Sequence, residues 1–191
     1  MRRGIFGGSF DPVHQGHLIV ASAAADALGL DRVHFVPAHV QPFKAARQHA
    51  SPADRVAMLR AALSHDERFV LDTREIDREG VSYTVDTLRA FTAEFPDDAL
   101  SLLIGADAAR DFPEWREASA IAQLADVVVL TRPGEQIPRG GPPGRVLRVP
   151  AVDVSATQVR ERVRRGDPIE HLVPAAVARY IESHRLYRTG D

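Results

Sequence analysis

Short apolar runs alternate along the chain with longer segments in which apolar residues recur every three or four positions. The runs predict six β-strands, at Arg3–Phe6, Arg32–Pro37, Phe69–Asp72, Leu100–Gly105, Asp126–Thr131 and Arg145–Val149. The other segments predict six helices, at Gly16–Leu28, Pro52–Leu63, Thr84–Glu94, Trp115–Leu124, Ser155–Arg165 and Pro174–Ser183. Because most strands are apolar throughout, helices are expected to cover both faces of the sheet. The alternation predicts an α/β fold with a doubly wound parallel sheet and ligands at the carboxyl ends of the strands.

Local signals support these boundaries and indicate one domain. Ser51 precedes Pro52 as a capping serine, and Gly29 and Gly166 follow the first and fifth predicted helices, where a left-handed residue is favoured. The loop at residues 38–50 follows the second strand and is placed to fold over a bound ligand. A chain of 191 residues suits one sizeable core, so we predict a single domain over residues 1–191 with a small C-terminal helical part.

Composition narrows the class of protein. Hydrophobic residues make up 45% and charged residues 26%, which is typical of a globular protein, and the net charge of −2 disfavours a protein that mainly neutralises nucleic acid. The absence of cysteine excludes disulfides, thiolate nucleophiles and cysteine-ligated metals. The first residues do not resemble a signal peptide, and no run of about 18 apolar residues occurs, so a cytoplasmic location is expected.

The segment from Gly7 to Leu18 carries the clearest chemical signal. Its sequence, Gly-Gly-Ser-Phe-Asp-Pro-Val-His-Gln-Gly-His-Leu, joins the first predicted strand to the first predicted helix. The glycine pair lets backbone N–H groups approach a bulky anion, and His14 and His17 lie where the helix dipole favours phosphate. These features predict a site for polyphosphate chemistry. Taken alone, the two histidines are also compatible with helix capping, and a zinc site would need a third ligand.

This segment resembles the first signature of the nucleotidyltransferases with a His-x-Gly-His motif. Over nearly the whole chain the likeness is greatest to the bacterial nicotinate-nucleotide adenylyltransferases, which make deamido-NAD and pyrophosphate from ATP and nicotinate mononucleotide. The resemblance implies a Rossmann-like fold and direct in-line attack without a covalent enzyme intermediate. It also implies that His14 and His17 are catalytic. ATP is expected to contact His17 together with Gly7, Gly8, Ser9, Phe10 and Gly16.

Two further elements resemble the ATP site of this family. Ser155-Ala-Thr157-Gln-Val-Arg160 matches the Ser-x-Thr-x-x-Arg element for the β- and γ-phosphates, and an arginine fork suits phosphate oxygens. Gly105-Ala-Asp107, at the end of a strand and the start of a short helix, matches a Gly-x-Asp whose backbone lies beside adenosine and whose carboxylate lies near the ribose hydroxyls. Helix capping is the competing interpretation of Ser155 and of Asp107.

Four residues are expected at the acceptor nucleotide. Trp115, the only tryptophan, matches the family's pyridine pocket, and Thr84 matches the threonine beside the pyridine carboxylate. Arg132 matches a family Arg-Pro-Gly, and Lys44 lies where the family has Pro-His-Lys or Pro-His-Arg, although Phe43 replaces the histidine here. The alternatives are a core position for the tryptophan, an N-cap for the threonine, closure of a strand end by the arginine and a plain exposed loop lysine.

The sequence therefore predicts an adenylyltransferase for nicotinate mononucleotide. Mg²⁺ is expected to travel with ATP, held chiefly by phosphates and water, because no obvious cluster of Asp and Glu offers a separate site. Two alternatives stay open: an enzyme that prefers nicotinamide mononucleotide or accepts both, and a non-catalytic nucleotide sensor. Phosphopantetheine adenylyltransferase shares the first signature but is shorter and lacks the Gly-Ala-Asp…Trp arrangement. Small molecules, rather than nucleic acid or membrane, are the expected partners, and a homo-oligomer is compatible with the sequence.

Overall fold

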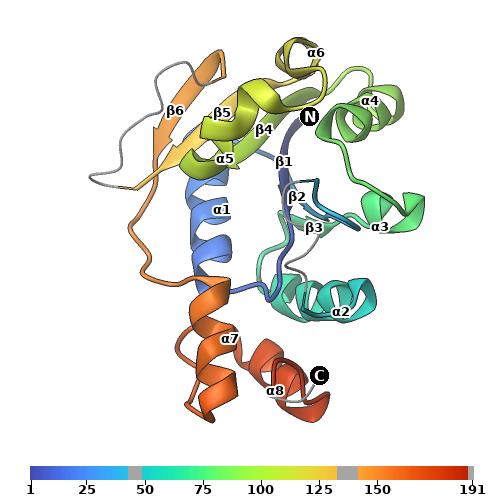
Figure 1. Cartoon of the computed structure of the whole chain (residues 1–191). Helices are drawn as coiled ribbons and strands as arrows, with labels where there is room; N and C mark the ends of the chain where they lie inside the picture. The colour runs from blue at the N-terminus through green and yellow to red at the C-terminus, as the bar shows by residue number, and fades with distance from the viewer. Residues whose placement is uncertain (43–48, 133–141, 189–191) are drawn as a thin grey trace.

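The computed structural model describes residues 1–42, 49–132 and 142–188. Within these ranges, six parallel strands form one sheet in the order β3-β2-β1-β4-β5-β6 (Figure 1). They are β1 (Arg2–Gly8), β2 (Arg32–Pro37), β3 (Phe69–Leu71), β4 (Ala99–Gly105), β5 (Asp126–Thr131) and β6 (Gly144–Arg148). The order reverses between β1 and β4, so their carboxyl ends flank the crevice where such sheets bind ligands. The predicted doubly wound parallel sheet is confirmed.

The helices agree with the prediction at most positions. They are α1 (Gln15–Leu28), α2 (Pro52–Ala62), α3 (Arg74–Arg78), α4 (Thr84–Glu94), α5 (Ala106–Asp111), α6 (Ala118–Leu124), α7 (Ala156–Arg165) and α8 (Ala175–Ser183), with 3₁₀ turns at Leu63–His65 and Phe112–Glu114. The expected helix start at Trp115 is wrong, because Trp115 is extended and Glu117 adopts a left-handed conformation with φ 54°. Helix α3 was not predicted, since five residues are too few to show a helical period.

Alternate residues of each strand face the two sides of the sheet. In β5, Val128 and Leu130 join a core formed with α1, α2, α7 and α8. Val127 and Val129, from the same strand, join a second core formed with α4, α5 and α6. Burial on both faces explains why the strands are apolar throughout rather than alternating.

The last two helices lie beyond the sheet rather than alongside it. In Figure 1, α7 and α8 occupy the end of the molecule toward which β1 runs. The carboxyl ends of the strands therefore point toward α7 and α8, and the turn that follows β1 lies between them. No helix in the described part of the chain is long and apolar enough to cross a lipid bilayer.

Candidate active site

The turn after β1 is fixed by aromatic packing. Phe10 has a positive φ of 48° and turns its ring back toward the strand end, so a Cβ on Gly8 would lie 3.1 Å from that ring. The ring is buried and packs at centroid distances of 5.7 Å from Phe6 and 5.7 Å from Phe35. Gly8 therefore makes room for Phe10, and any contact of Phe10 with a nucleotide has to come from its backbone.

The two predicted catalytic histidines lie together at the start of α1. Their rings stack with centroids 3.7 Å apart and an interplanar angle of 24°. His14 is the N-cap residue, and its backbone N–H donates to Nδ1 of His17 over 3.2 Å. Because Nδ1 accepts this bond, neutral His17 is assigned its proton on Nε2, where it is a hydrogen-bond donor. The arrangement provides an imidazole donor at the positive end of a helix.

His14 is held in its buried position by the glycine that follows. A Cβ on Gly16 would lie 3.1 Å from two atoms of the His14 ring, so a larger residue there would push the ring away by a few tenths of an ångström. Burial, and secondly the charge of Arg132, lower the pKa of His14 from 6.5 to about 4. The ring is therefore neutral near neutral pH. Its Nδ1 atom is buried and has no hydrogen-bond partner among the described residues.

The lowered pKa of His14 predicts a loss of stability in acid. The unfolded chain binds this proton near pH 6.5 and the folded chain only near pH 4, so the free energy of unfolding falls as the pH drops through that window. The loss reaches about 3 kcal/mol at the lower end. We expect His14→Asn, which does not titrate, to show a shallower decline in urea unfolding measured across this window. Equal declines in both proteins would contradict a buried, neutral His14.

A buried arginine that the sequence analysis did not single out joins the turn to the loop after β2. Arg55, on α2, has no exposed surface. Its Nη1 donates to the carbonyl oxygens of Ser9 at 2.9 Å and Ala38 at 2.7 Å, and its Nη2 donates to that of His39 at 3.2 Å. Burial lowers the pKa of Arg55, while the nearby Asp11 carboxylate raises it. The guanidinium thus acts as a clamp between two backbone segments that border the site.

The loop after β2 makes further contacts before residue 43. The hydroxyl of Ser9 donates to Oε1 of Gln41 over 2.6 Å, so this predicted ATP contact also holds the loop. The backbone N–H of Ser82 donates to the carbonyl of Val40 over 2.9 Å, and the Ser82 hydroxyl accepts from the N–H of His39 over 3.0 Å. The loop is therefore fastened both to the turn after β1 and to the segment that leads into α4.

The second predicted signature reaches the first through Arg160. Nη1 of Arg160 donates to the backbone carbonyl of Asp11 over 2.7 Å, and Nη2 donates to the hydroxyl of Thr157 over 3.1 Å. Ser155 is the N-cap of α7 and accepts from the N–H of Gln158 over 3.2 Å, as its capping interpretation expects. Asp11 and Arg160 are 149 residues apart in sequence. The structure thus brings Arg160 next to the segment from Ser9 to His17, which we call the histidine turn.

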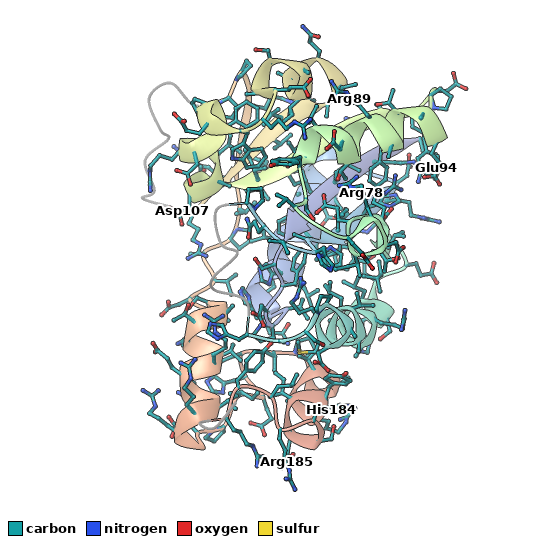
Figure 2. All side chains as sticks on the ribbon, turned by 45° about the vertical axis from the view of Figure 1, so that its right-hand side comes forward. Arg78, Arg89, Glu94, Asp107, His184 and Arg185 are labelled. Carbon is teal, nitrogen blue, oxygen red and sulfur yellow. The ribbon has the colours of Figure 1, made fainter. Side chains whose placement is uncertain are left out.

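The predicted ribose-binding residues, Gly105 and Asp107, are exposed at the junction of β4 and α5 and do not line the cavity. Gly105 ends β4 as the N-cap of α5, and a Cβ there would meet no atom within 4 Å. The Asp107 side chain is 91% exposed, lies 3.4 Å from Arg110, and projects outward in Figure 2. The N-cap interpretation of Asp107 is wrong, because Gly105 occupies that position. The carboxylate is accessible to a ribose that approaches from solvent.

A cavity of about 410 Å³ extends from Gly7 and Gly8, at the carboxyl end of β1, to the predicted pyridine pocket. Gly7, Gly8, Thr84 and Trp115 are among its lining residues, whereas His14, His17 and Arg160 are not. Thr84 is the first residue of α4, whose N-cap is Tyr83, so the N-cap interpretation of Thr84 is wrong. The aliphatic part of the lining consists of Ile5, Val36, Ala38, Pro42, Leu102, Ile104 and Ile121. A flat, mostly apolar ring with a polar substituent matches this lining.

Three charged residues that were not anticipated from the sequence, Glu75, Glu114 and Arg116, also line the cavity. The Arg116 guanidinium lies 4.8 Å from the centre of the Tyr83 ring and 3.7 Å from a carboxylate oxygen of Asp86. Glu75 is buried and accepts from the hydroxyl of Thr87 over 2.5 Å, and burial raises the pKa of its carboxyl group.

The remaining predicted residues, Arg132 and Lys44, are not seen to contact the cavity in the described part of the chain. Arg132 follows β5 and lies near enough to His14 to lower its pKa, and it is not among the described residues that line the cavity. Lys44 and Phe43 fall outside the described residues, so the role expected for Lys44 stays a prediction. In the ranges that the structure describes, no group of three or more His, Asp or Glu side chains is arranged to hold a metal ion.

The fold and the histidine turn define a nucleotidyltransferase, and residues 5–162 match the family described as cytidylyltransferase-like. The chain is 45% identical over 189 residues to a probable nicotinate-nucleotide adenylyltransferase of Thermus thermophilus, covering 98% of this chain and 100% of that protein. It is 39% identical over 188 residues to the protein of the same name from Bacillus pumilus, covering 97% and 98%. The chain belongs to the nicotinate-nucleotide adenylyltransferase family.

Solved structures agree on the fold. The nicotinic acid mononucleotide adenylyltransferase of Plasmodium falciparum, complexed with APC, superimposes with a TM-score of 0.80 at 17% identity, covering 97% of this chain and 96% of that one. The same enzyme complexed with NaAD gives 0.80 at 16% identity, covering 97% of both chains. At these identities the likeness concerns the arrangement of the sheet and helices.

Proposed function

We propose that this chain transfers the adenylyl group of ATP to nicotinate mononucleotide, giving deamido-NAD and pyrophosphate. The observation that carries the proposal is the continuity of the cavity from the glycine turn to Thr84 and Trp115. A nucleotide whose pyridine ring lies against Trp115 extends its phosphate toward the turn that carries His14 and His17. An acceptor that already carries a phosphate nucleophile needs no covalent enzyme intermediate.

In this proposal the chain positions the reactants and stabilises charge. The acceptor phosphate forms a new bond to the α-phosphorus of ATP while the bond to the leaving pyrophosphate breaks. Nε2–H of His17 and the positive end of α1 face oxygens that gain negative charge, and Arg160 provides a cation on the far side of the turn. We also propose that ATP brings Mg²⁺ on its phosphates, where the ion withdraws negative charge.

Two features favour the acid form of the acceptor over the amide. The first turn of α4, at Tyr83 and Thr84, lines the cavity with the positive end of an 11-residue helix. Arg116 adds a cation to the same lining, which also holds the carboxyl groups of Glu75 and Glu114. The helix end and Arg116 attract a pyridine carboxylate more strongly than a neutral amide, whereas the two glutamates act in the opposite sense.

The test is release of pyrophosphate from ATP and Mg²⁺ with three acceptors: nicotinate mononucleotide, nicotinamide mononucleotide and phosphopantetheine. A strong preference for the first is expected. Comparable rates with both pyridine nucleotides would replace the proposal with a dual-specific enzyme. No release with any acceptor would favour a nucleotide sensor. The cytoplasmic location, the single-domain organisation and the oligomeric state stay predictions.

Trp115→Ala tests the position of the pyridine ring. Loss of a stacking partner is expected to raise KM for nicotinate mononucleotide about tenfold and to leave KM for ATP nearly unchanged. Trp115→Phe keeps an aromatic face and serves as the control, with a smaller rise. If both substrates lose affinity equally, the tryptophan supports packing, for which its 5.4 Å contact with Phe112 is the obvious source.

A further inference from the structure

A buried hydrogen bond that the proposed mechanism does not use joins the first motif to the C-terminal segment. The hydroxyl of Tyr187 donates to Oδ1 of Asp11 over 2.7 Å, across 176 residues of sequence. Both side chains are buried, with 4% of Asp11 and 7% of Tyr187 exposed. The sequence pattern of the C-terminal segment indicates only a packing helix, yet this residue places its polar atom on the histidine motif.

Tyr187 reaches Asp11 because the chain turns back sharply after α8. Arg185 and Tyr187 both have positive φ, 54° and 62°, in the left-handed region that residues with a Cβ rarely occupy. Burial first, and then the Asp11 carboxylate, raise the pKa of the Tyr187 phenol, so the hydroxyl stays a neutral donor. Such a backbone conformation persists only where surrounding contacts maintain it, and the bond to Asp11 is one of them.

The Asp11 carboxylate gathers three donors at one point. Besides the Tyr187 hydroxyl, it accepts from the backbone N–H groups of His49 over 2.7 Å and of Ala50 over 3.1 Å. The buried Arg55 lies close enough for the two charges to interact. The carboxylate is therefore fixed by the segment before α2 and by the C-terminal segment together.

The backbone of the same residue holds the arginine of the second signature. The carbonyl of Asp11 accepts from Nη1 of Arg160 over 2.7 Å, while Nε of Arg160 is buried and has no hydrogen-bond partner in the part of the chain described. The position of the guanidinium thus depends on where this carbonyl points. Contacts that fix the Asp11 side chain also fix the peptide group of Asp11. They therefore fix the position of the Arg160 guanidinium as well.

We propose that Tyr187 is a positioning residue of the ATP-phosphate site, acting through Asp11 on Arg160. The proposal rests on the proposed function only in taking ATP as the ligand of Arg160. Without the hydroxyl, the carboxylate keeps two of its three donors and the turn relaxes, so Arg160 loses its fixed acceptor. The expected consequence is weaker ATP binding with unchanged binding of the acceptor nucleotide.

The experiment compares two variants that remove the same group. Tyr187→Phe deletes the hydroxyl that binds Asp11, and Tyr180→Phe deletes a hydroxyl that donates to Oδ1 of Asp54 over 2.9 Å from the same C-terminal segment. Affinity for Mg²⁺-bound ATP is measured by calorimetry, which needs no acceptor and therefore stays informative even if the acceptor assignment fails. We expect Tyr187→Phe to weaken ATP binding about five- to tenfold and Tyr180→Phe to leave it unchanged.

A double-mutant cycle separates positioning from simple loss of stability. In an Arg160→Ala background, Tyr187→Phe is expected to cause no further loss of ATP affinity, because the residue through which it acts is gone. If Tyr187→Phe is unfolded, Asp11→Ala tests the same link by removing the oxygen that accepts from the Tyr187 hydroxyl, and weaker ATP binding is again expected. Normal ATP affinity in folded Tyr187→Phe, or additive losses in the cycle, would overturn the proposal.

Discussion

Alanine in place of His17 is expected to lower kcat by at least about 100-fold while leaving the fold intact. The Nδ1 atom of His17 accepts the backbone N–H of His14, so its Nε2 carries the proton that can be donated to a phosphoryl oxygen. Removing that donor costs most in the transition state, where negative charge on the oxygens is greatest. The measurement is kcat from pyrophosphate release with both substrates saturating, together with a thermal unfolding curve.

His184→Ala is the matched control for this experiment. His184 is exposed at the end of α8, at the lower end of the view in Figure 2, and is stacked on Tyr180. Its replacement is expected to leave kcat unchanged. A His17→Ala variant with near-normal kcat would remove His17 from the mechanism, whereas loss of activity accompanied by unfolding would assign it a structural role.

Methionine in place of Arg55 is expected to lower the free energy of unfolding by about 3–5 kcal/mol. The substitution keeps an apolar stem but removes the donors to three backbone carbonyls, at Ser9, Ala38 and His39. It also leaves the buried Asp11 carboxylate without its neighbouring positive charge. The turn after β1 and the loop after β2 then lose their common anchor. The measurement is urea unfolding at neutral pH.

Arg60→Met provides the comparison within the same helix. Arg60 is exposed near the end of α2, so the change is expected to cost less than about 0.5 kcal/mol. A loss from Arg55→Met no larger than this would mean that water satisfies the three carbonyls and that the guanidinium is not needed as a clamp.

The fold was largely predictable because the signals that define it are local. Most strands contain a short apolar run, and most long helices carry a regular apolar stripe or a clear cap, as at Ser51 and Gly166. The first signature follows β1 and leads into α1, and the second leads into α7, as the local sequence predicted for each. Trp115 was assigned to a helix because nothing in the residues around it announces the left-handed turn at Glu117.

The supports of the site were less predictable because they depend on long-range contacts. Arg55 offers a signal that was overlooked: it shares one helix face with Met58, Leu59 and Ala62, all buried, so a charge stands in an apolar stripe. Tyr187 gives no such sign, because its partner Asp11 is 176 residues away. Arg116 was not predicted because it matches no motif of the family, whereas the adjacent Trp115 does.

The contact between Asp11 and Tyr187 also determines when, during protein synthesis, the hydrogen bonds of the histidine turn can be completed. The ribosome makes the histidine motif early, and 176 further residues must follow before the tyrosine that completes its hydrogen bonds is available. Helix α1 and the first strands can pair while the chain is still growing, but the buried carboxylate lacks one donor until that late residue has emerged. An incompletely translated chain would therefore hold a histidine turn without its full set of anchors. The site becomes complete only once Tyr187 has been made, after all six strands of the described sheet.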